Sequence, residues 1–175
     1  MKSVRKIAVL ALAGAYAAAL GPAAHAAVYT NGTATANMAV TLTIAANCTI
    51  AAAPLNFGST GVLATPVNQT STLTVTCTNT TPYNIGLDAG TVTGSTIAAR
   101  LLAGTGTGNT ATTVGFQLYQ NAGRTVIWGN TQDTNTVPGT GTGTAQTITV
   151  YGQVAAQSTP RPDTYQTSVT ATVYF

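Results

Sequence analysis

The sequence predicts an all-β fold, a sandwich of short strands, from three observations. Short runs in which apolar and polar residues alternate recur along the chain, and clusters of Gly, Asn and Pro separate them. No window combines helical periodicity with capping residues. Thr makes up about a quarter of the residues after position 26, and this β-branched residue suits an exposed strand face. The length allows one domain with a core of its own.

The expected strands follow from these alternating runs, taken in chain order. They are residues 34–45, 48–51, 71–77, 83–87, 97–102, 114–119, 125–128, 146–154 and 164–175. In the run 71–77, Leu73, Val75 and Cys77 share the inward face. Two stretches rich in Gly, Thr and Asn, 103–113 and 131–145, are expected loops, because so little apolar surface cannot offset the entropy of ordering.

The first 26 residues have the pattern of a secretory signal peptide. Lys2, Arg5 and Lys6 precede an apolar stretch at 7–20, and the residues at 24–26 fit a small-x-small cleavage motif. The apolar stretch is short for a membrane span, although an uncleaved anchor is the alternative. We therefore expect an exported protein whose mature chain has no membrane span.

After this leader the chain carries little charge and few catalytic side chains. It has no Lys, Glu or His, and its charges balance to zero between Arg100, Arg124, Arg161, Asp88, Asp133 and Asp163. The commonest general bases, the nucleophilic amine and most zinc chemistry are therefore missing. Asp88 and Asp133 could in principle pair as in a glycosidase, but turn-forming roles are favoured. We expect no enzyme, no cofactor and no nucleic-acid partner.

Cys48 and Cys77 are the only cysteines of the chain. In an exported protein an even pair predicts one disulfide, and here it would enclose about 28 residues. A loop of this length implies a stabilisation of about 3–4 kcal/mol in the chain-entropy description. Metal ligation or a redox pair are the alternatives, and the lack of a second pair or a Cys-x-x-Cys motif disfavours both.

Two side chains have both a structural and a functional interpretation, and a third has a structural one only. Trp128 and Tyr119 could form an aromatic platform for a sugar, but both lie in strand-like runs, which favours the core. Arg124 lies in the turn 121–124 and is expected to be a solvated hairpin tip.

The two end segments lead to a hypothesis about function. The last run has one apolar face, made of Val169, Ala171, Val173 and Phe175. The front run has one too, made of Ala34, Ala36, Met38, Val40, Leu42 and Ile44. A front strand that is free to leave and a last core strand with no successor predict a subunit that completes its neighbour.

A series of short motifs runs along the chain after the leader. In order they are Asn47-Cys48-Thr49-Ile50, Leu55-Asn56-Phe57-Gly58, Leu73-Thr74-Val75-Thr76-Cys77, Leu87-Asp88-Ala89-Gly90, Phe116-Gln117-Leu118-Tyr119, Trp128-Gly129, Gly141-Thr142-Gly143 and Val150-Tyr151-Gly152-Gln153-Val154. Together with the ending from Asp163-Thr164-Tyr165 to Val173-Tyr174-Phe175, they resemble the spore coat protein U domain. One departure is Asp163, where family members often carry Gly, and it puts the geometry of that turn in doubt.

This domain is shared by subunits of archaic chaperone–usher pili and by some secreted coat proteins. The resemblance to the pilins implies an incomplete immunoglobulin-like β-sandwich, completed by donor-strand complementation. It also implies a periplasmic chaperone, an outer-membrane usher and a homopolymeric surface fibre that supports adhesion and biofilm formation. On this interpretation residues 27–46 are the donor segment and residues 47–175 are the domain.

The resemblance also assigns roles to the two apolar faces. The side chains that would fill a neighbour's groove are Met38, Val40, Leu42 and Ile44. The alternative is that they belong to an ordinary first strand of their own sandwich. The residues that would pair with the chaperone are Val169, Ala171, Val173 and Phe175, and without the resemblance these are simply core.

Two other functions stay open from the sequence. One is a secreted coat protein that binds a cell or spore surface without polymerising. The other is a carbohydrate-binding module that uses Trp128 and Tyr119.

Overall fold

The structure is a computed structural model that describes residues 31–175, so the predicted signal peptide lies outside the described residues. Residues 42–175 belong to one compact unit, and residues 31–41 belong to another. All strands of the described residues lie in the compact unit. No helix among the described residues is long and apolar enough to cross a membrane.

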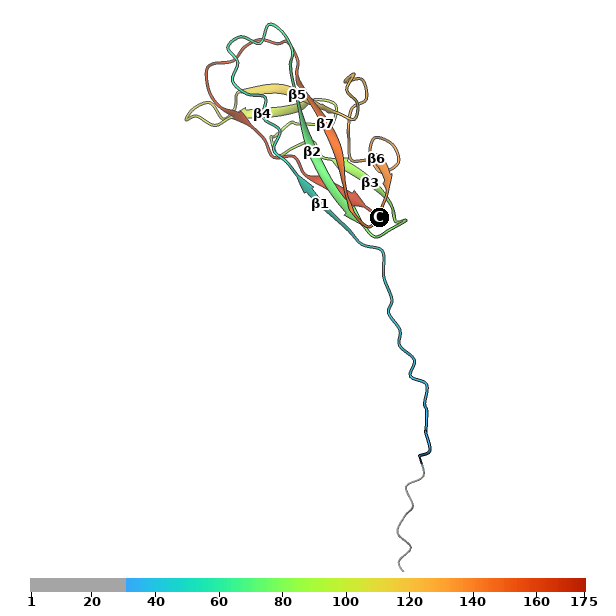
Figure 1. The fold of residues 1–175 in the computed structure, drawn as a ribbon. Coiled ribbons are helices and arrows are strands. Elements are labelled where there is room, and N and C mark those ends of the chain that lie inside the picture. Colours follow the sequence, from blue (N-terminus) through green and yellow to red (C-terminus); the bar gives the residue numbers. More distant parts are fainter. Residues whose placement is uncertain (1–30) are drawn as a thin grey trace, which may run out of the picture. The chain divides into compact units, whose positions relative to one another are not determined.

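Nine strands are formed by the described residues. In chain order they are β1 (Cys48–Ala52), β2 (Val67–Cys77), β3 (Pro82–Leu87), β4 (Arg100–Gly104), β5 (Thr113–Tyr119), β6 (Val137–Thr140), β7 (Ala145–Val154), β8 (Tyr165–Gln166) and β9 (Ala171–Tyr174). A six-stranded sheet has the order β1-β2-β7-β5-β4-β8, and a three-stranded sheet has the order β6-β3-β9 (Figure 1). All registered strand pairs are antiparallel. The all-β prediction is confirmed.

β2 and β7 form the centre of the larger sheet. They pair from Val67 with Val154 to Thr76 with Ala145, the longest ladder of the fold. The inward face predicted for β2 is confirmed, because Leu73, Val75 and Cys77 are only 3%, 0% and 1% exposed. The core lies between the two sheets and is built from the inward faces of β2, β3, β5 and β7 together with Trp128.

A disulfide joins β1 to β2 at the first pair of their ladder. Cys48 lies opposite Cys77, their Cα atoms are 4.1 Å apart, and their sulfurs are bonded as predicted. Asn47, the residue before β1, is bonded to Thr78, the residue after β2. The Asn47 N–H donates to Thr78 Oγ1 (3.1 Å), and the Thr78 N–H donates to the Asn47 carbonyl (2.9 Å). The entry of the chain into the domain is therefore fixed to the end of β2.

The strand expected at residues 34–45 does not form. No part of this segment pairs with a strand, and each of its residues is exposed. A single strand gains no ladder hydrogen bonds and buries no face by itself, so an apolar alternation alone does not produce a strand.

Two other strands differ from the sequence-based expectation. β4 begins at Arg100 and not at residue 97, because Thr96 and Ala99 close a turn in which the N–H of each bonds to the carbonyl of the other at 3.1 Å. β6 lies inside the predicted loop 131–145. Its pairing with β3 is a backbone ladder through Pro138 and Gly139, which a search for apolar alternation does not detect.

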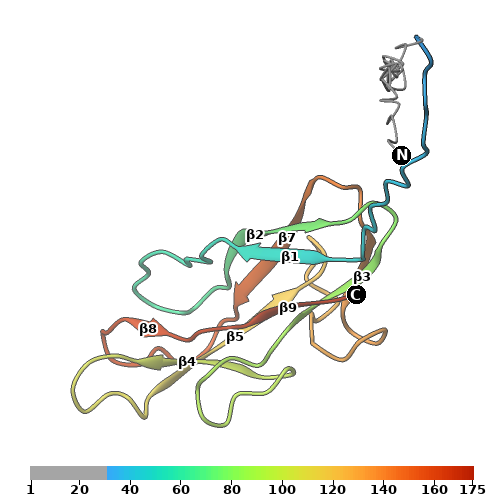
Figure 2. The same cartoon turned by 90° about the horizontal axis from the view of Figure 1, so that it is seen from below.

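The predicted runs 125–128 and 164–175 also differ from the observed strands. In the run 125–128 only Ile127 forms a bridge, with Tyr119. The run 164–175 is divided, because β8 pairs with β4 in the larger sheet and β9 pairs with β3 in the smaller one. The chain therefore crosses from one sheet to the other between β8 and β9 (Figure 2).

The aromatic platform proposed from the sequence is excluded for one of its members. Trp128 is 0% exposed, and its Nε1–H donates to the Ile85 carbonyl at 2.8 Å. A ring with no exposed surface cannot stack on a sugar, so the preferred interpretation of Trp128 as core is confirmed. The expectation for Arg124 is wrong in part, since this side chain is half-buried and its Nε–H donates to the Gly152 carbonyl at 3.3 Å.

Arg100 is a fully buried cation that connects both sheets. It is 0% exposed, and its guanidinium donates to the carbonyls of Leu87 (2.9 Å), Asp88 (2.9 Å) and Trp128 (2.6 Å) and to Gln117 Oε1. Burial lowers its pKa to about 10, although the nearby Asp88 opposes this shift. Because Arg100 lies in β4 of the larger sheet and Leu87 in β3 of the smaller one, Arg100 links the two sheets, which no strand ladder joins.

Asp163 fixes the turn that precedes β8. Its carboxylate accepts hydrogen bonds from the Gly106 N–H (2.8 Å), the Thr164 N–H (2.7 Å) and Asn109 Nδ2. These bonds, led by the one from Asn109, lower the pKa of Asp163 from 3.8 to about 2. Asp163, which stands where similar sequences often carry Gly, therefore connects this turn by hydrogen bonds to the loop that follows β4.

Replacing Arg100 by Met is expected to destabilise the domain by about 3 kcal/mol, because three buried carbonyls lose their donor. Urea unfolding of the folded chain measures the loss. The exposed Arg161 gives the matched control, and Arg161→Met is expected to stay within about 0.5 kcal/mol of the native chain. Equal effects of the two substitutions would contradict the role given to Arg100.

The turn at Asp163 is expected to weaken in acid. Since the pKa of this group is lower in the folded chain, its carboxylate contributes stability above pH 3.8, and this contribution is lost as the pH falls towards about 2. The difference in thermal stability between the native chain and Asp163→Asn should therefore be constant near neutral pH and shrink over that acid interval. A difference that does not change with pH would show that the carboxylate charge plays no part.

Candidate functional site

A groove opens into the apolar core of the compact unit. It encloses about 950 Å³ and is lined by side chains from both sheets and from two long connections. Its floor consists of inward-facing apolar side chains, namely Leu73, Leu87, Leu102, Val114, Phe116, Leu118, Val150 and Val154. Most of these residues belong to the core itself, so the groove is an opening of the core and not a separate surface pocket.

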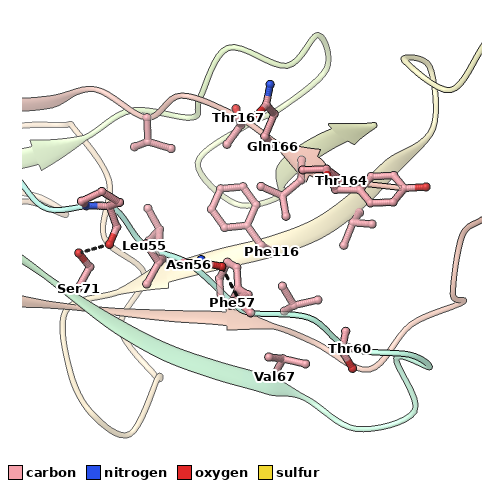
Figure 3. Close-up of a pocket in the computed structure, with 18 of the residues that line it drawn as sticks. Leu55, Asn56, Phe57, Thr60, Val67, Ser71, Phe116, Thr164, Gln166 and Thr167 are labelled. Carbon is pink, nitrogen blue, oxygen red and sulfur yellow. Dashed lines mark hydrogen bonds between the residues drawn. The ribbon is translucent and has the colours of Figure 1, made fainter. Parts of the chain in front are cut away.

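One wall of the groove is the connection between β1 and β2. Leu55 and Phe57 project from it towards Phe116, while Gln166 and Thr167 lie across the groove (Figure 3). The rings of Phe57 and Phe116 meet edge to face with centroids 6.2 Å apart. This wall packs on β7 at Gly152, where a Cβ atom would lie 2.5 Å from Leu55 Cδ2 and would push the wall away.

The groove opens at one end of β1 and β9. Its lining includes Ala52 but no earlier residue of β1, and Ala171 but no later residue of β9. The groove therefore lies where β1 ends and β9 begins. Beyond it, towards the other end of these two strands, the core is closed, and Val75 and Ile85 are both 0% exposed.

β1 and β9 flank this groove and each has a free edge. β1 is the first strand of the larger sheet and β9 is the last strand of the smaller one, so each pairs on one side only among the described residues. The two strands lie next to each other and run in opposite directions (Figure 2). A free edge carries backbone donors and acceptors that an added strand can satisfy.

The residues predicted for the last strand lie along this groove. Val169 and Ala171 line it, and Val173 packs against the core beyond the groove. Phe175 is 59% exposed and does not join that face. The first three are only half-buried, because nothing in the described residues covers their free side.

The residues predicted for the front segment are among the most exposed apolar side chains of the described chain. Met38, Val40, Leu42 and Ile44 are 84%, 86%, 87% and 76% exposed. They are not part of a strand of their own sandwich here, which was the alternative interpretation of this segment. The described chain thus contains an uncovered apolar groove and an uncovered apolar segment.

The chemistry of the groove is that of a binding surface. Its only charged lining residues are Arg161 and Asp163, both exposed and both at the rim. No group of three or more His, Cys, Asp or Glu residues in the described part of the chain could hold a metal ion. Sequence reasoning did not find Leu55, Phe57 and Phe116 as site residues, although all three stand in motifs of the resemblance, namely Leu55-Asn56-Phe57-Gly58 and Phe116-Gln117-Leu118-Tyr119.

Comparisons with known proteins give the fold and the family. Fourteen chains of solved structures match. One belongs to the crystal structure of the CsuC–CsuE chaperone–tip adhesion subunit pre-assembly complex from archaic chaperone–usher Csu pili of Acinetobacter baumannii. That chain is 24% identical with a TM-score of 0.53, and the match covers 76% of this chain and 40% of that one. The likeness shows the fold, an incomplete immunoglobulin-like β-sandwich.

No curated protein matches the sequence. The family model of the spore coat protein U domain matches residues 34–172, which is most of the chain and includes the exposed front segment. On this match, the chain belongs to the spore coat protein U domain family.

Proposed function

We propose that this protein is a structural subunit of a surface fibre and that the segment 34–45 of one copy fills the groove of the next. One observation carries the proposal, namely an apolar core left open between two free strand edges in a chain that also exposes an alternating apolar segment. The occupant of the groove is thus a second copy of this chain, and the product is a homopolymer.

The physical gain from such an exchange is large. An added strand satisfies backbone groups on the free edges of β1 and β9, and every second side chain enters the groove. Fully burying four side chains of the size of Met38, Val40, Leu42 and Ile44 contributes about 6–12 kcal/mol before the costs of ordering. The exposed segment and the open groove therefore stabilise each other only when the segment occupies the groove.

The extent of the family domain supports the proposal. The match begins at residue 34, the first residue of the alternating segment, and not at the first strand of the compact unit. A segment that is part of the domain in the family and yet is exposed and unpaired in the single chain is expected to act on a partner.

The position of the groove favours one direction of insertion. A strand antiparallel to β9 would place its last residues where β9 begins, which is where the groove opens. Leu42 and Ile44 of the neighbour would then meet the open floor around Phe116. Ala34 and Ala36 would lie between β1 and β9, and these two strands would have to move apart to admit them.

The proposed assembly pathway rests on the similarity to archaic pilins. We infer export through the signal peptide and a periplasmic chaperone that covers the groove before assembly, with pairing along Val169, Ala171, Val173 and Phe175. An outer-membrane usher would then replace the chaperone by the front segment of the next subunit. The matched crystal structure is itself described as a chaperone complex of a tip adhesion subunit, which supports the chaperone as a partner. Adhesion and biofilm formation would be the roles of the fibre.

Leu42→Asp is expected to abolish polymer formation, because an unpaired carboxylate would enter the apolar groove of the neighbour. Sizing of the chain from residue 27 measures polymer, and circular dichroism checks that the domain stays folded. Thr43→Asp is the matched control, since Thr43 lies on the opposite face of the segment and this variant should still polymerise. Polymer at the native level from Leu42→Asp would exclude Leu42 as an inserted side chain.

Moving the segment to the other end of the domain is expected to give a stable monomer. In the rearranged chain, residues 46–175 are followed by a short Gly/Ser linker and then by residues 27–45. The segment can then enter its own groove antiparallel to β9, and thermal unfolding should occur at a much higher temperature than in the native order. The same rearranged chain with Leu42→Asp is the control and should lose this gain.

The opposite result would favour the alternative function. If the native order is already a stable monomer and the rearranged chain gains nothing, the sandwich does not need a second copy. A secreted coat protein that does not polymerise would then be the better interpretation.

A further inference from the structure

Met38 is the one methionine of the chain outside the predicted signal peptide. The chain contains two methionines, and the other is Met1. The side chain of Met38 is 84% exposed, and the segment around it pairs with no strand of the described chain. The thioether sulfur of Met38 is therefore open to water and to small oxidants in the single chain.

The other side chains that oxidants commonly attack are shielded. Cys48 and Cys77, the only cysteines of the chain, share a disulfide and offer no thiolate. Trp128, the only tryptophan, is 0% exposed, and its Nε1–H donates to the Ile85 carbonyl. Tyrosine rings react far more slowly with peroxides than a thioether does. Oxidation of the folded chain is therefore directed to one atom, the sulfur of Met38.

The reaction at this sulfur requires a peroxide and yields methionine sulfoxide. With hydrogen peroxide, the Met38 sulfur attacks one oxygen atom, the O–O bond breaks as the S–O bond forms, and the other oxygen leaves as water. The sulfur is oxidised by two electrons, and the peroxide is reduced by the same two. The product is polar and chiral, whereas the thioether is apolar and flexible. Methionine sulfoxide reductases reverse the reaction, with one enzyme for each epimer.

The position of Met38 gives this reaction a consequence. Met38 lies on the same face of the segment as Val40 and Leu42, which is the face proposed to enter the groove of a neighbour. The floor of that groove consists of apolar side chains, which offer a sulfoxide oxygen no hydrogen-bond donor. Burying a polar group without a hydrogen bond costs free energy, so the oxidised segment is excluded where the reduced one fits. Leu at this position would fill a similar volume without being sensitive to oxidation.

We propose that Met38 is a site of reversible oxidation that controls whether the front segment can fill the groove of a second copy. The thioether form inserts, and the sulfoxide form stays outside. After insertion the neighbour covers Met38, so a peroxide stops the growth of the fibre and leaves intact the contacts that have already formed between copies. This inference rests on the proposed function, because the oxidation acts on assembly.

Treatment of the chain from residue 27 with hydrogen peroxide tests the inference. Mass spectrometry should find one added oxygen atom, at Met38, and sizing should show polymer forming more slowly by about tenfold or more. Methionine sulfoxide reductases for both epimers should restore the native rate. Met38→Leu is the matched control and should polymerise equally with and without peroxide. Peroxide added after polymerisation should leave Met38 largely unoxidised.

Each opposite result overturns the inference. Met38 that stays unoxidised in the single chain, while free methionine reacts, is not an accessible site. An oxidised chain that polymerises at the native rate shows that the sulfoxide does not exclude the segment. Peroxide that also stops Met38→Leu acts at another residue, and Met38 that reacts equally fast in polymer and single chain is not covered by insertion.

Failure of the proposed function is distinguishable from these results. In that case the untreated chain forms no polymer and the rearranged chain described above gains no stability, and the inference fails together with the proposed function.

Discussion

An opening into the apolar core, beside the end of β1 and the beginning of β9, is the feature on which the rest of this domain depends. The floor of the groove is made of the same leucines, valines and Phe116 that form the core, so leaving it open exposes apolar surface at about 25 cal/mol per Å². Two free strand edges add unpaired backbone groups. Under the proposed function, a strand from a second copy would cover this surface, and the stability of the domain would become a property of the assembly.

The rest of the domain is held together by connections that do not depend on a strand added at the groove. Arg100 joins the carbonyls of Leu87, Asp88 and Trp128, and the disulfide joins β1 to the longest ladder of the fold. Asp163 fastens the turn before β8 to the loop after β4. These links use few residues, and they keep both walls of the groove in place while it is empty.

Much of the fold could be predicted because local alternation and burial agree in the central strands. Leu73, Val75 and Cys77 are an example, since their spacing alone gave the inward face of β2. β6 could not be predicted in this way, because Pro138 and Gly139 offer a backbone ladder and no apolar pattern. Arg100 was missed for a related reason. A charged residue is expected at the surface, and only the tertiary arrangement brings the carbonyls that satisfy it.

The groove itself was harder to predict than the segment proposed to fill it. An alternating run such as Met38 to Ile44 can be found in one stretch of sequence, whereas the lining of a groove comes from residues far apart in the chain. Leu55 and Phe57 belong to a connection without strands, and their meeting with Phe116 depends on the bare surface of β7 at Gly152. The motif Leu55-Asn56-Phe57-Gly58 contributed to the resemblance to the family. It did not indicate where these side chains lie in the fold.

The position of the disulfide has a mechanical consequence. Any pull along the front segment reaches the domain at Asn47, one residue before Cys48, and at Cys48 a covalent bond leads directly into β2. Without that bond, the load would open the β1–β2 ladder one pair at a time from its first position, and a wall of the groove would be lost. With it, the load reaches β2 through the covalent bond, and the β1–β2 hydrogen bonds are bypassed. Reduction of the disulfide would thus place on the wall of the groove a load that otherwise does not reach it.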